Sequence, residues 1–229
     1  MKLFSAFTLF FCVLNCLAAN VPVVSSCDDR IATNSSQVSK NNHILLNVFK
    51  HYCYEDHSGS FDLFLNEKQD FVSKEGRLSS TIAAQLFKRS LTGEPIPQWS
   101  IRDLTDAREA GVYFSSTLTE LADIDGDGLI EPIFVYMFIP GEKGVVNYVD
   151  DWEFTGRLKI ILFYKSQKVV IRAITGTLDG TRDTRANALF FELPKKIQRH
   201  LVRKMERMYR DGTFLFDNSY NFWPRKAKD

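Results

Sequence analysis

The segment GRLKIILFYKSQKVVIRAITG, residues 156–176, places the strongest constraint on the fold. Two runs rich in β-branched and aromatic residues flank the polar residues 165–168, which is the pattern of a β-hairpin. An isolated hairpin is marginally stable in water, so further strands must lie beside it. The chain is therefore expected to contain an antiparallel sheet.

Further strands are expected before this hairpin. The residues at 59–68, GSFDLFLNEK, alternate between apolar and polar and favour a strand. Other β-like segments lie at 99–104, 111–125 and 132–139. The segment 79–90, SSTIAAQLFKRS, predicts a short helix that begins at a serine cap. Residues 43–55 fit a helix or a strand, and the local pattern does not decide between them.

The C-terminal region changes to helical periodicity. Apolar residues recur there at helical intervals, at Leu193, Ile197, Leu201, Met205 and Met208. Pro194 suits the first turn of a helix, and Gly212 suits its C-terminal cap. The expected fold class is α+β, with an antiparallel β-sheet and a C-terminal helix packed on one face.

The first residues predict a signal peptide at 1–18. Lys2 supplies a positive charge, an apolar run follows, and small residues around Ala18 suit cleavage. The run is short for a spanning helix, and an uncleaved membrane anchor is the alternative. No transmembrane segment is expected in the mature chain. We expect a periplasmic or secreted protein with a flexible N-terminal segment at 19–42 and a single domain at 43–229.

Charge and cysteine content restrict the partners and the bonding of the mature chain. The chain has 29 Lys and Arg against 28 Asp and Glu, and loss of Lys2 with the signal peptide leaves 28 of each. This balance does not favour a nucleic-acid partner. Of the four cysteines, Cys27 and Cys53 remain after cleavage, and in an exported chain they are expected to form a disulfide. Two separate buried thiols are the alternative.

The sequence LADIDGDGLIEPIFVY contains an acidic loop with calcium-type spacing. Calcium takes six to eight oxygen ligands, and carboxylates at alternate positions of a tight turn converge on one point. Gly128, at loop position six, permits the sharp turn. The predicted ligands are Asp123, Asp125, Asp127, Leu129 through its carbonyl, and Glu131. The predicted cofactor is therefore a structural Ca²⁺ ion.

The loop is not an EF-hand. An EF-hand would carry a glutamate at position twelve between two helices, whereas Phe134 stands there and the flanking residues are β-like. Two alternatives to a calcium site remain. A bare polar turn is one alternative, because Asp-Gly pairs are common in turns. A catalytic acid/base pair is the other, but it requires two carboxylates around a substrate pocket.

Other polar segments have two interpretations each. The predicted C-terminal helix carries seven cations, Lys195, Lys196, Arg199, Arg203, Lys204, Arg207 and Arg210. They form either a binding face for an anionic partner or a solvated outer surface. The segment 174–187 either lines a binding site or forms an ion-paired loop. The four histidines are scattered and are interpreted as surface or structural residues.

The second half of the chain resembles a family of small exported bacterial proteins labelled as surface polysaccharide biosynthesis proteins. The resemblance covers roughly residues 99–215 and is carried by the acidic loop, by GRLKIILFYKSQKVVIRAITGTLD, and by ELPKKIQ. It implies a location in the cell envelope and a link to surface glycan such as lipopolysaccharide. It supplies no catalytic residues for this chain.

The function expected from the sequence is that of an exported, non-enzymatic cell-envelope protein with a structural calcium loop, which supports surface polysaccharide biosynthesis. The expected partners are an anionic glycan or an envelope protein. Two alternatives stay open, an envelope enzyme acting on glycan and an inhibitor or immunity-type protein that blocks a hydrolase. The sequence contains none of the common nucleophile or metalloprotease motifs, which favours a non-enzymatic protein.

Overall fold

The computed structural model describes residues 22–25, 27, 46–73, 76–146, 156–176, 179–217 and 221–228. The predicted signal peptide and most of the predicted flexible segment lie outside these residues. No helix in the described ranges is both long and apolar enough to cross a membrane.

The first part of the chain forms one antiparallel sheet, here called the N-terminal sheet, with the strand order β1-β2-β3-β6-β7. Its strands are β1 (Val23–Ser25), β2 (Asn47–Asp56), β3 (Gly59–Glu67), β6 (Thr81–Arg89) and β7 (Pro95–Leu104). The short strands β4 (Phe71–Ser73) and β5 (Gly76–Leu78) pair with each other.

The second part forms the C-terminal sheet, in which β9 lies between β8 and β11. Its strands are β8 (Glu109–Ala122), β9 (Glu131–Glu142), β10 (Val145–Val146), β11 (Gly156–Tyr164), β12 (Gln167–Thr175), β13 (Asp183–Ala186) and β14 (Arg225–Lys226). All pairs are antiparallel except β13 with β14. A 3₁₀ helix, η1 (Asp179–Thr181), precedes β13.

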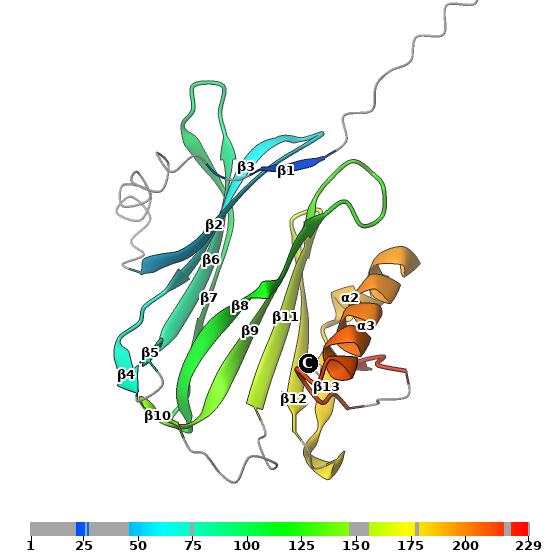
Figure 1. Cartoon of the computed structure of the whole chain (residues 1–229). Coiled ribbons are helices and arrows are strands. Elements are labelled where there is room, and N and C mark those ends of the chain that lie inside the picture. The colour runs from blue at the N-terminus through cyan, green and yellow to red at the C-terminus, as the bar shows by residue number, and fades with distance from the viewer. Residues whose placement is uncertain are drawn as a thin grey trace, which may run out of the picture.

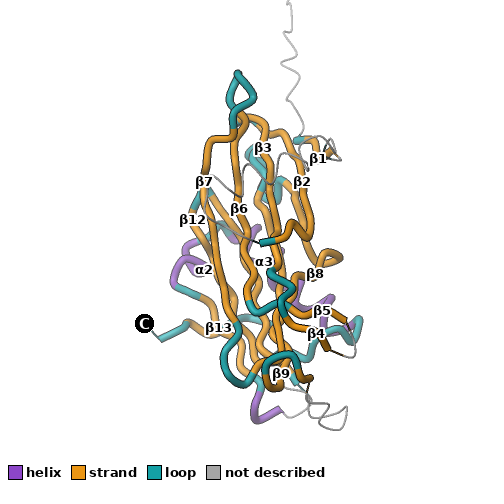
Figure 2. Tube along the Cα trace, turned by 90° about the vertical axis from the view of Figure 1, so that its left-hand side faces the viewer, coloured by secondary structure: helices purple, strands orange, loops and turns teal. Residues whose placement is uncertain are grey.

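The two sheets and one helix form three layers (Figure 1). The helices are α2 (Ala188–Glu192) and α3 (Lys195–Arg210), both of which lie beside the C-terminal sheet. Figure 2 views the molecule from the side of the N-terminal sheet, with α3 behind the strands. The C-terminal sheet is thus the middle layer, covered on both faces.

Strand β9 shows why its sequence lacks alternation. Side chains alternate between the two faces of a strand. Phe134 packs into the core between the sheets, whereas Ile133 and Val135 pack into the core beneath α3. Since both faces are buried, residues 132–139 form a continuous run without a charged residue and show no alternation.

The C-terminal helix confirms the prediction from periodicity. Pro194 is the N-cap residue of α3, and Gly212 follows the C-cap Asp211 with a positive φ of 68°. Its apolar residues Ile197, Leu201, Met205 and Met208 lie in the core against the C-terminal sheet. A C-terminal helix on one face of an antiparallel sheet is therefore present.

The α+β prediction is correct only in outline, because the fold is predominantly β. The described residues form two main sheets rather than one, and α2 and α3 are the α-helices among them. The helix predicted at 79–90 is wrong, since these residues form strand β6. Residues from Thr81 to Phe87 are all buried, and this continuous burial removes the alternation typical of a strand.

The N-terminal region also contains more strand than expected. Within the segment predicted to be flexible, Val23–Ser25 form β1 and pair with β2. The undecided residues at 43–55 contribute most of β2. Local sequence could not place β1, because it is three residues long and depends on its neighbour for hydrogen bonds.

The hairpin of β11 and β12 is confirmed, with a tighter turn than expected. Gln167 pairs with Tyr164, so the turn consists of Lys165 and Ser166 alone. Both adopt positive φ, 48° and 64°, as a two-residue turn of type I′ requires. Neither residue is glycine or asparagine, so this conformation costs free energy.

Cys27 and Cys53 form the predicted disulfide, which joins residues whose Cα atoms lie 5.2 Å apart. It ties the N-terminal segment to β2 beside the β1 pairing. Disulfides are typical of proteins in oxidising compartments.

Reduction of the Cys27–Cys53 disulfide is expected to lower the free energy of unfolding by about 3 kcal/mol, because the open chain gains conformational entropy. Urea denaturation with and without reductant measures the difference. The Cys27→Ala/Cys53→Ala variant is the control and should not respond to reductant. Two free thiols in the native protein, detected by mass spectrometry, would contradict the bond itself.

Candidate metal loop and adjacent cleft

The acidic loop connects β8 to β9, where Ala122 pairs with Glu131. It lies next to α3 in Figure 1. The Asp123 carboxylate organises the turn by accepting three backbone N–H groups, those of Gly126 at 2.7 Å, Asp127 at 3.1 Å and Gly128 at 3.0 Å. The aspartate at position one therefore closes the loop on itself, as the spacing predicts.

Three predicted ligands converge in this loop. Asp123, Asp125 and Glu131 each place a carboxylate oxygen within 4.8 Å of the others. Glu131 is 2% exposed, and its Oε2 accepts the Ile124 N–H at 2.7 Å. Such a set of hard oxygen donors fits calcium in ligand type.

The electrostatics of Glu131 favour a cation at this point. Burial, together with the negative charges of three aspartates in the loop, raises the pKa of Glu131 to about 7, although the Ile124 N–H opposes the shift. An ionised Glu131 is therefore costly in the folded protein without a nearby positive charge. A divalent ion would supply that charge.

Asp127 does not belong to this converging group. The Asp127 carboxylate accepts the Leu129 N–H at 3.0 Å and lies 3.3 Å from the Lys165 ammonium. The assignments of the Asp127 carboxylate and the Leu129 carbonyl as ligands are still predictions. For Asp127 to bind an ion, its carboxylate would have to exchange Lys165 for the metal.

Three other elements hold the loop in place. From the β2–β3 turn, the His57 N–H donates to the Gly128 carbonyl at 3.0 Å, and Asp56 accepts the Ile130 N–H at 3.1 Å. At the end of β11, the Tyr164 hydroxyl donates to Asp125 at 3.3 Å. From α3, Lys196 donates to the Asp125 carbonyl at 2.9 Å. Sequence reasoning missed these contacts, because each partner is distant in the chain.

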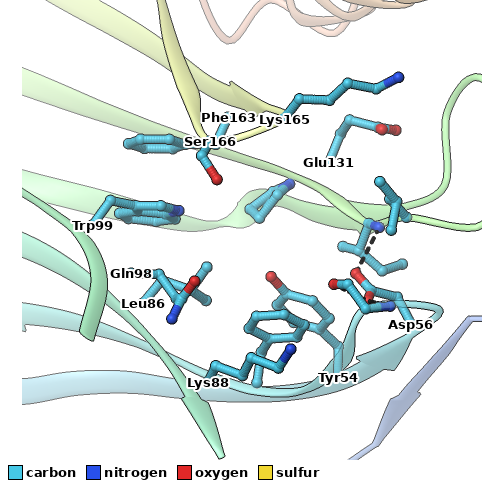
Figure 3. Close-up of a pocket in the computed structure, with 15 residues that line it drawn as sticks. Tyr54, Asp56, Leu86, Lys88, Gln98, Trp99, Glu131, Phe163, Lys165 and Ser166 are labelled. Atoms are coloured by element: carbon cyan, nitrogen blue, oxygen red, sulfur yellow. Dashed lines mark hydrogen bonds between the residues drawn. The ribbon is translucent and has the colours of Figure 1, made fainter. Parts of the chain in front are cut away.

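A cleft of about 370 Å³ opens beside the loop, between the edges of the two sheets (Figure 3). Its apolar wall includes Trp99 of β7, which stacks on Phe163 of β11 with ring centroids 3.6 Å apart. Its polar groups come from five separate segments and include Tyr54, Asp56, Lys88, Gln98, Glu131, Lys165 and Ser166. No motif in the sequence indicated this cleft.

The two carboxylates that line the cleft are already engaged. Asp56 accepts the Ser58 N–H and hydroxyl through Oδ1 and the Ile130 N–H through Oδ2. Glu131 is buried and belongs to the converging acidic group. A glycosidase needs one carboxylate to protonate the leaving group and another to attack or activate water. Both carboxylates are therefore held by backbone N–H groups, those of Ile130 and Ile124.

The disulfide lies in a polar cluster that the sequence did not reveal. Asp62 of β3 is opposite Cys53 in the register and pairs with His51 at 2.8 Å. Arg89 of β6 holds the Asp62 carboxylate with two hydrogen bonds of 2.7 Å and donates to the Cys53 sulfur at 3.0 Å. The His51 side chain is thus 7% exposed and hydrogen-bonded within the sheet, in line with its structural interpretation.

The cations of α3 are partly neutralised. Lys204 is buried and lies 2.6 Å from Glu120 of β8, and Arg207 contacts the same carboxylate at 3.3 Å. Arg210 pairs with Glu206 on the helix itself. Part of the basic pattern is therefore structural.

The polar segment 174–187 contains η1 and strand β13. Asp183 pairs with Arg185 at 2.7 Å and with Arg225 of β14 at 2.6 Å. These contacts agree with the ion-paired interpretation of this segment.

Comparison with known proteins gives no relative: no protein-family model, curated protein or solved structure matches the chain.

Proposed function

We propose that this protein is an exported, non-enzymatic cell-envelope protein that binds one calcium ion in its β8–β9 loop and supports surface polysaccharide biosynthesis by binding. The ion is structural in this proposal. It neutralises the converging carboxylates and fixes the connection between two strands of the middle layer.

The observation that carries the proposal is the convergence of Asp123, Asp125 and Glu131 within 4.8 Å of one another. Calcium completes its coordination with backbone carbonyls and water, so a few carboxylates on one loop are enough to define the site. The link to surface polysaccharide rests on the sequence resemblance described above. The cleft beside the loop supports a binding role, since it offers aromatic and polar groups at one place.

An inhibitor function has less support. An inhibitor presents a loop that protrudes freely, whereas this loop is bonded to the β2–β3 turn, to Tyr164 and to Lys196. A catalytic function is disfavoured by the engagement of Asp56 and Glu131.

Calcium is expected to raise the melting temperature of the wild-type protein and to leave that of the Asp125→Ala/Asp127→Ala variant unchanged. A ligand that binds only the folded state stabilises it by about 2.7 kcal/mol at a hundredfold excess over its Kd. Thermal denaturation with calcium and with chelator measures the shift.

Magnesium serves as a control, because it prefers a smaller octahedral site and should stabilise less. Asp106→Ala, in a turn on another part of the surface, is the matched variant and should retain the full calcium effect. An equal rise in wild type and the double variant would refute the assignment.

A further inference from the structure

We propose that the cleft between the two sheets binds a sugar that carries a carboxylate, with Lys88 and Lys165 as the anion-binding groups. This inference rests on the proposed binding role in polysaccharide assembly and names the ligand class and the place where it binds.

The size and composition of the cleft suit a small polar ligand. Its volume of about 370 Å³ falls in the range of small-molecule sites, roughly 300–1,000 Å³. Trp99 stacks face to face on Phe163 with an interplanar angle of 3°, which holds the indole as a flat apolar wall of the cleft. A sugar ring presents one face of C–H groups that can pack on such a wall and hydroxyls around its edge.

The polar groups match those hydroxyls. The Tyr54 and Ser166 side chains enter the cleft from opposite sheets (Figure 3). Tyr54 is 4% exposed and lines the cleft with its phenol ring. Gln98 is oriented by donation of its Nε2 to the carbonyls of Ile96 and Pro97, which leaves its carbonyl oxygen for a ligand hydroxyl.

Lys88 supplies the cleft with a cation for an anionic ligand. Lys88 forms no ion pair with any carboxylate in the described part of the chain, and its ammonium lies 6.0 Å from the Phe61 ring centroid. The Asp56 carboxylate is held by Ser58 and Ile130 and does not face Lys88 as a partner. A ligand carboxylate beside the Lys88 ammonium would form a charge-assisted hydrogen bond.

The position of Lys165 couples the cleft to the loop. Its ammonium now pairs with Asp127 at 3.3 Å. If calcium recruits Asp127, Lys165 loses this partner and becomes available to the ligand. The strained turn is consistent with a functional role, because Lys165 and Ser166 both line the cleft and both hold a costly positive φ.

Isothermal titration calorimetry with galacturonate and galactose tests the inference, because these sugars differ in a carboxylate against a hydroxymethyl group. In calcium, galacturonate should bind about tenfold more tightly than galactose, as expected for one charge-assisted contact. Lys88→Met should weaken galacturonate binding about tenfold and leave galactose unchanged. Lys226→Met, at an exposed position on β14, is the matched control and should bind like wild type.

Gln98→Ala is a further variant at an exposed position, and it should weaken the binding of both sugars without affecting the fold. Absence of galacturonate binding, equal binding of both sugars, or wild-type affinity in Lys88→Met would overturn the inference. The calcium proposal is tested independently of the sugar proposal, since Lys88→Met should keep the full calcium-dependent rise in melting temperature. A calcium effect without sugar binding therefore refutes only the proposal that the cleft binds a sugar. Sugar binding without a calcium effect refutes only the proposal that the loop binds calcium.

Discussion

Replacing Glu120 with alanine is expected to lower the free energy of unfolding by about 4 kcal/mol, because it leaves a buried cation without its partner. The Lys204 side chain is 3% exposed, and its ammonium lies 2.6 Å from Glu120. The other carboxylate oxygen lies 2.6 Å from His200. Glu120 belongs to β8 and both partners belong to α3, so this contact joins the helix to the sheet.

Urea denaturation measures this loss, and the Glu120→Ala/Lys204→Met variant is its control. Methionine fills a similar volume without charge, so the double variant should recover most of the lost stability. Burial lowers the pKa of Lys204, and Glu120 opposes that shift. A cost below about 1 kcal/mol for Glu120→Ala, as for a surface pair, would contradict the buried arrangement.

The pH dependence of stability gives a second readout of Glu120. Burial alone would raise its pKa, but hydrogen bonds from His200 and Lys204 outweigh this effect and lower the pKa from 4.5 to about 2. Because the folded-state pKa is lower than that of the unfolded chain, the contribution to stability is complete above pH 4.5 and is lost as the pH falls toward 2. The Glu120→Ala variant should lack this part of the acid sensitivity.

Replacing Gly128 with alanine is the second large expected effect, with a loss of about 3 to 5 kcal/mol from overpacking and backbone strain. A Cβ atom at Gly128 would lie 2.0 Å from the His57 imidazole. Its φ of 84° is also a conformation that side chains disfavour. The substitution must displace either the histidine or the loop.

The Gly128→Ala/His57→Ala variant separates these two causes. Removal of the imidazole should relieve the collision and restore about half of the stability, while the strain of the positive φ persists. Gly93→Ala is the matched control, since its φ is 83° and its Cβ would meet no atom within 4 Å. Equal losses at Gly93 and Gly128 would show that the contact with His57 has no effect on stability.

The sequence predicted those elements whose pattern reflects one buried face or a turn. Hairpin β11–β12 and helix α3 follow from apolar periodicity and from end residues such as Pro194 and Gly212. Strand β6 was mistaken for a helix because burial on both faces leaves no alternation to detect. Periodicity therefore fails where neighbouring layers, rather than solvent, contact both faces.

The candidate site also has features that the sequence predicts and features that it does not. Convergence of Asp123, Asp125 and Glu131 follows from spacing within one loop. The engagement of Asp127 by Lys165 does not, because the lysine lies on another hairpin. The cleft was also beyond prediction, since its walls come from segments that only the packing of two sheets brings together. Local spacing encodes a loop, whereas a cleft depends on tertiary structure.

Calorimetric titration of calcium into the chelator-treated protein tests the central claim most directly. We predict binding of one ion per chain in the wild type and no binding heat in the Asp125→Ala/Asp127→Ala variant, because the converging carboxylates of the β8–β9 loop form the site. A flat titration of the folded wild type, or identical heats in both proteins, would contradict the claim that this loop holds calcium.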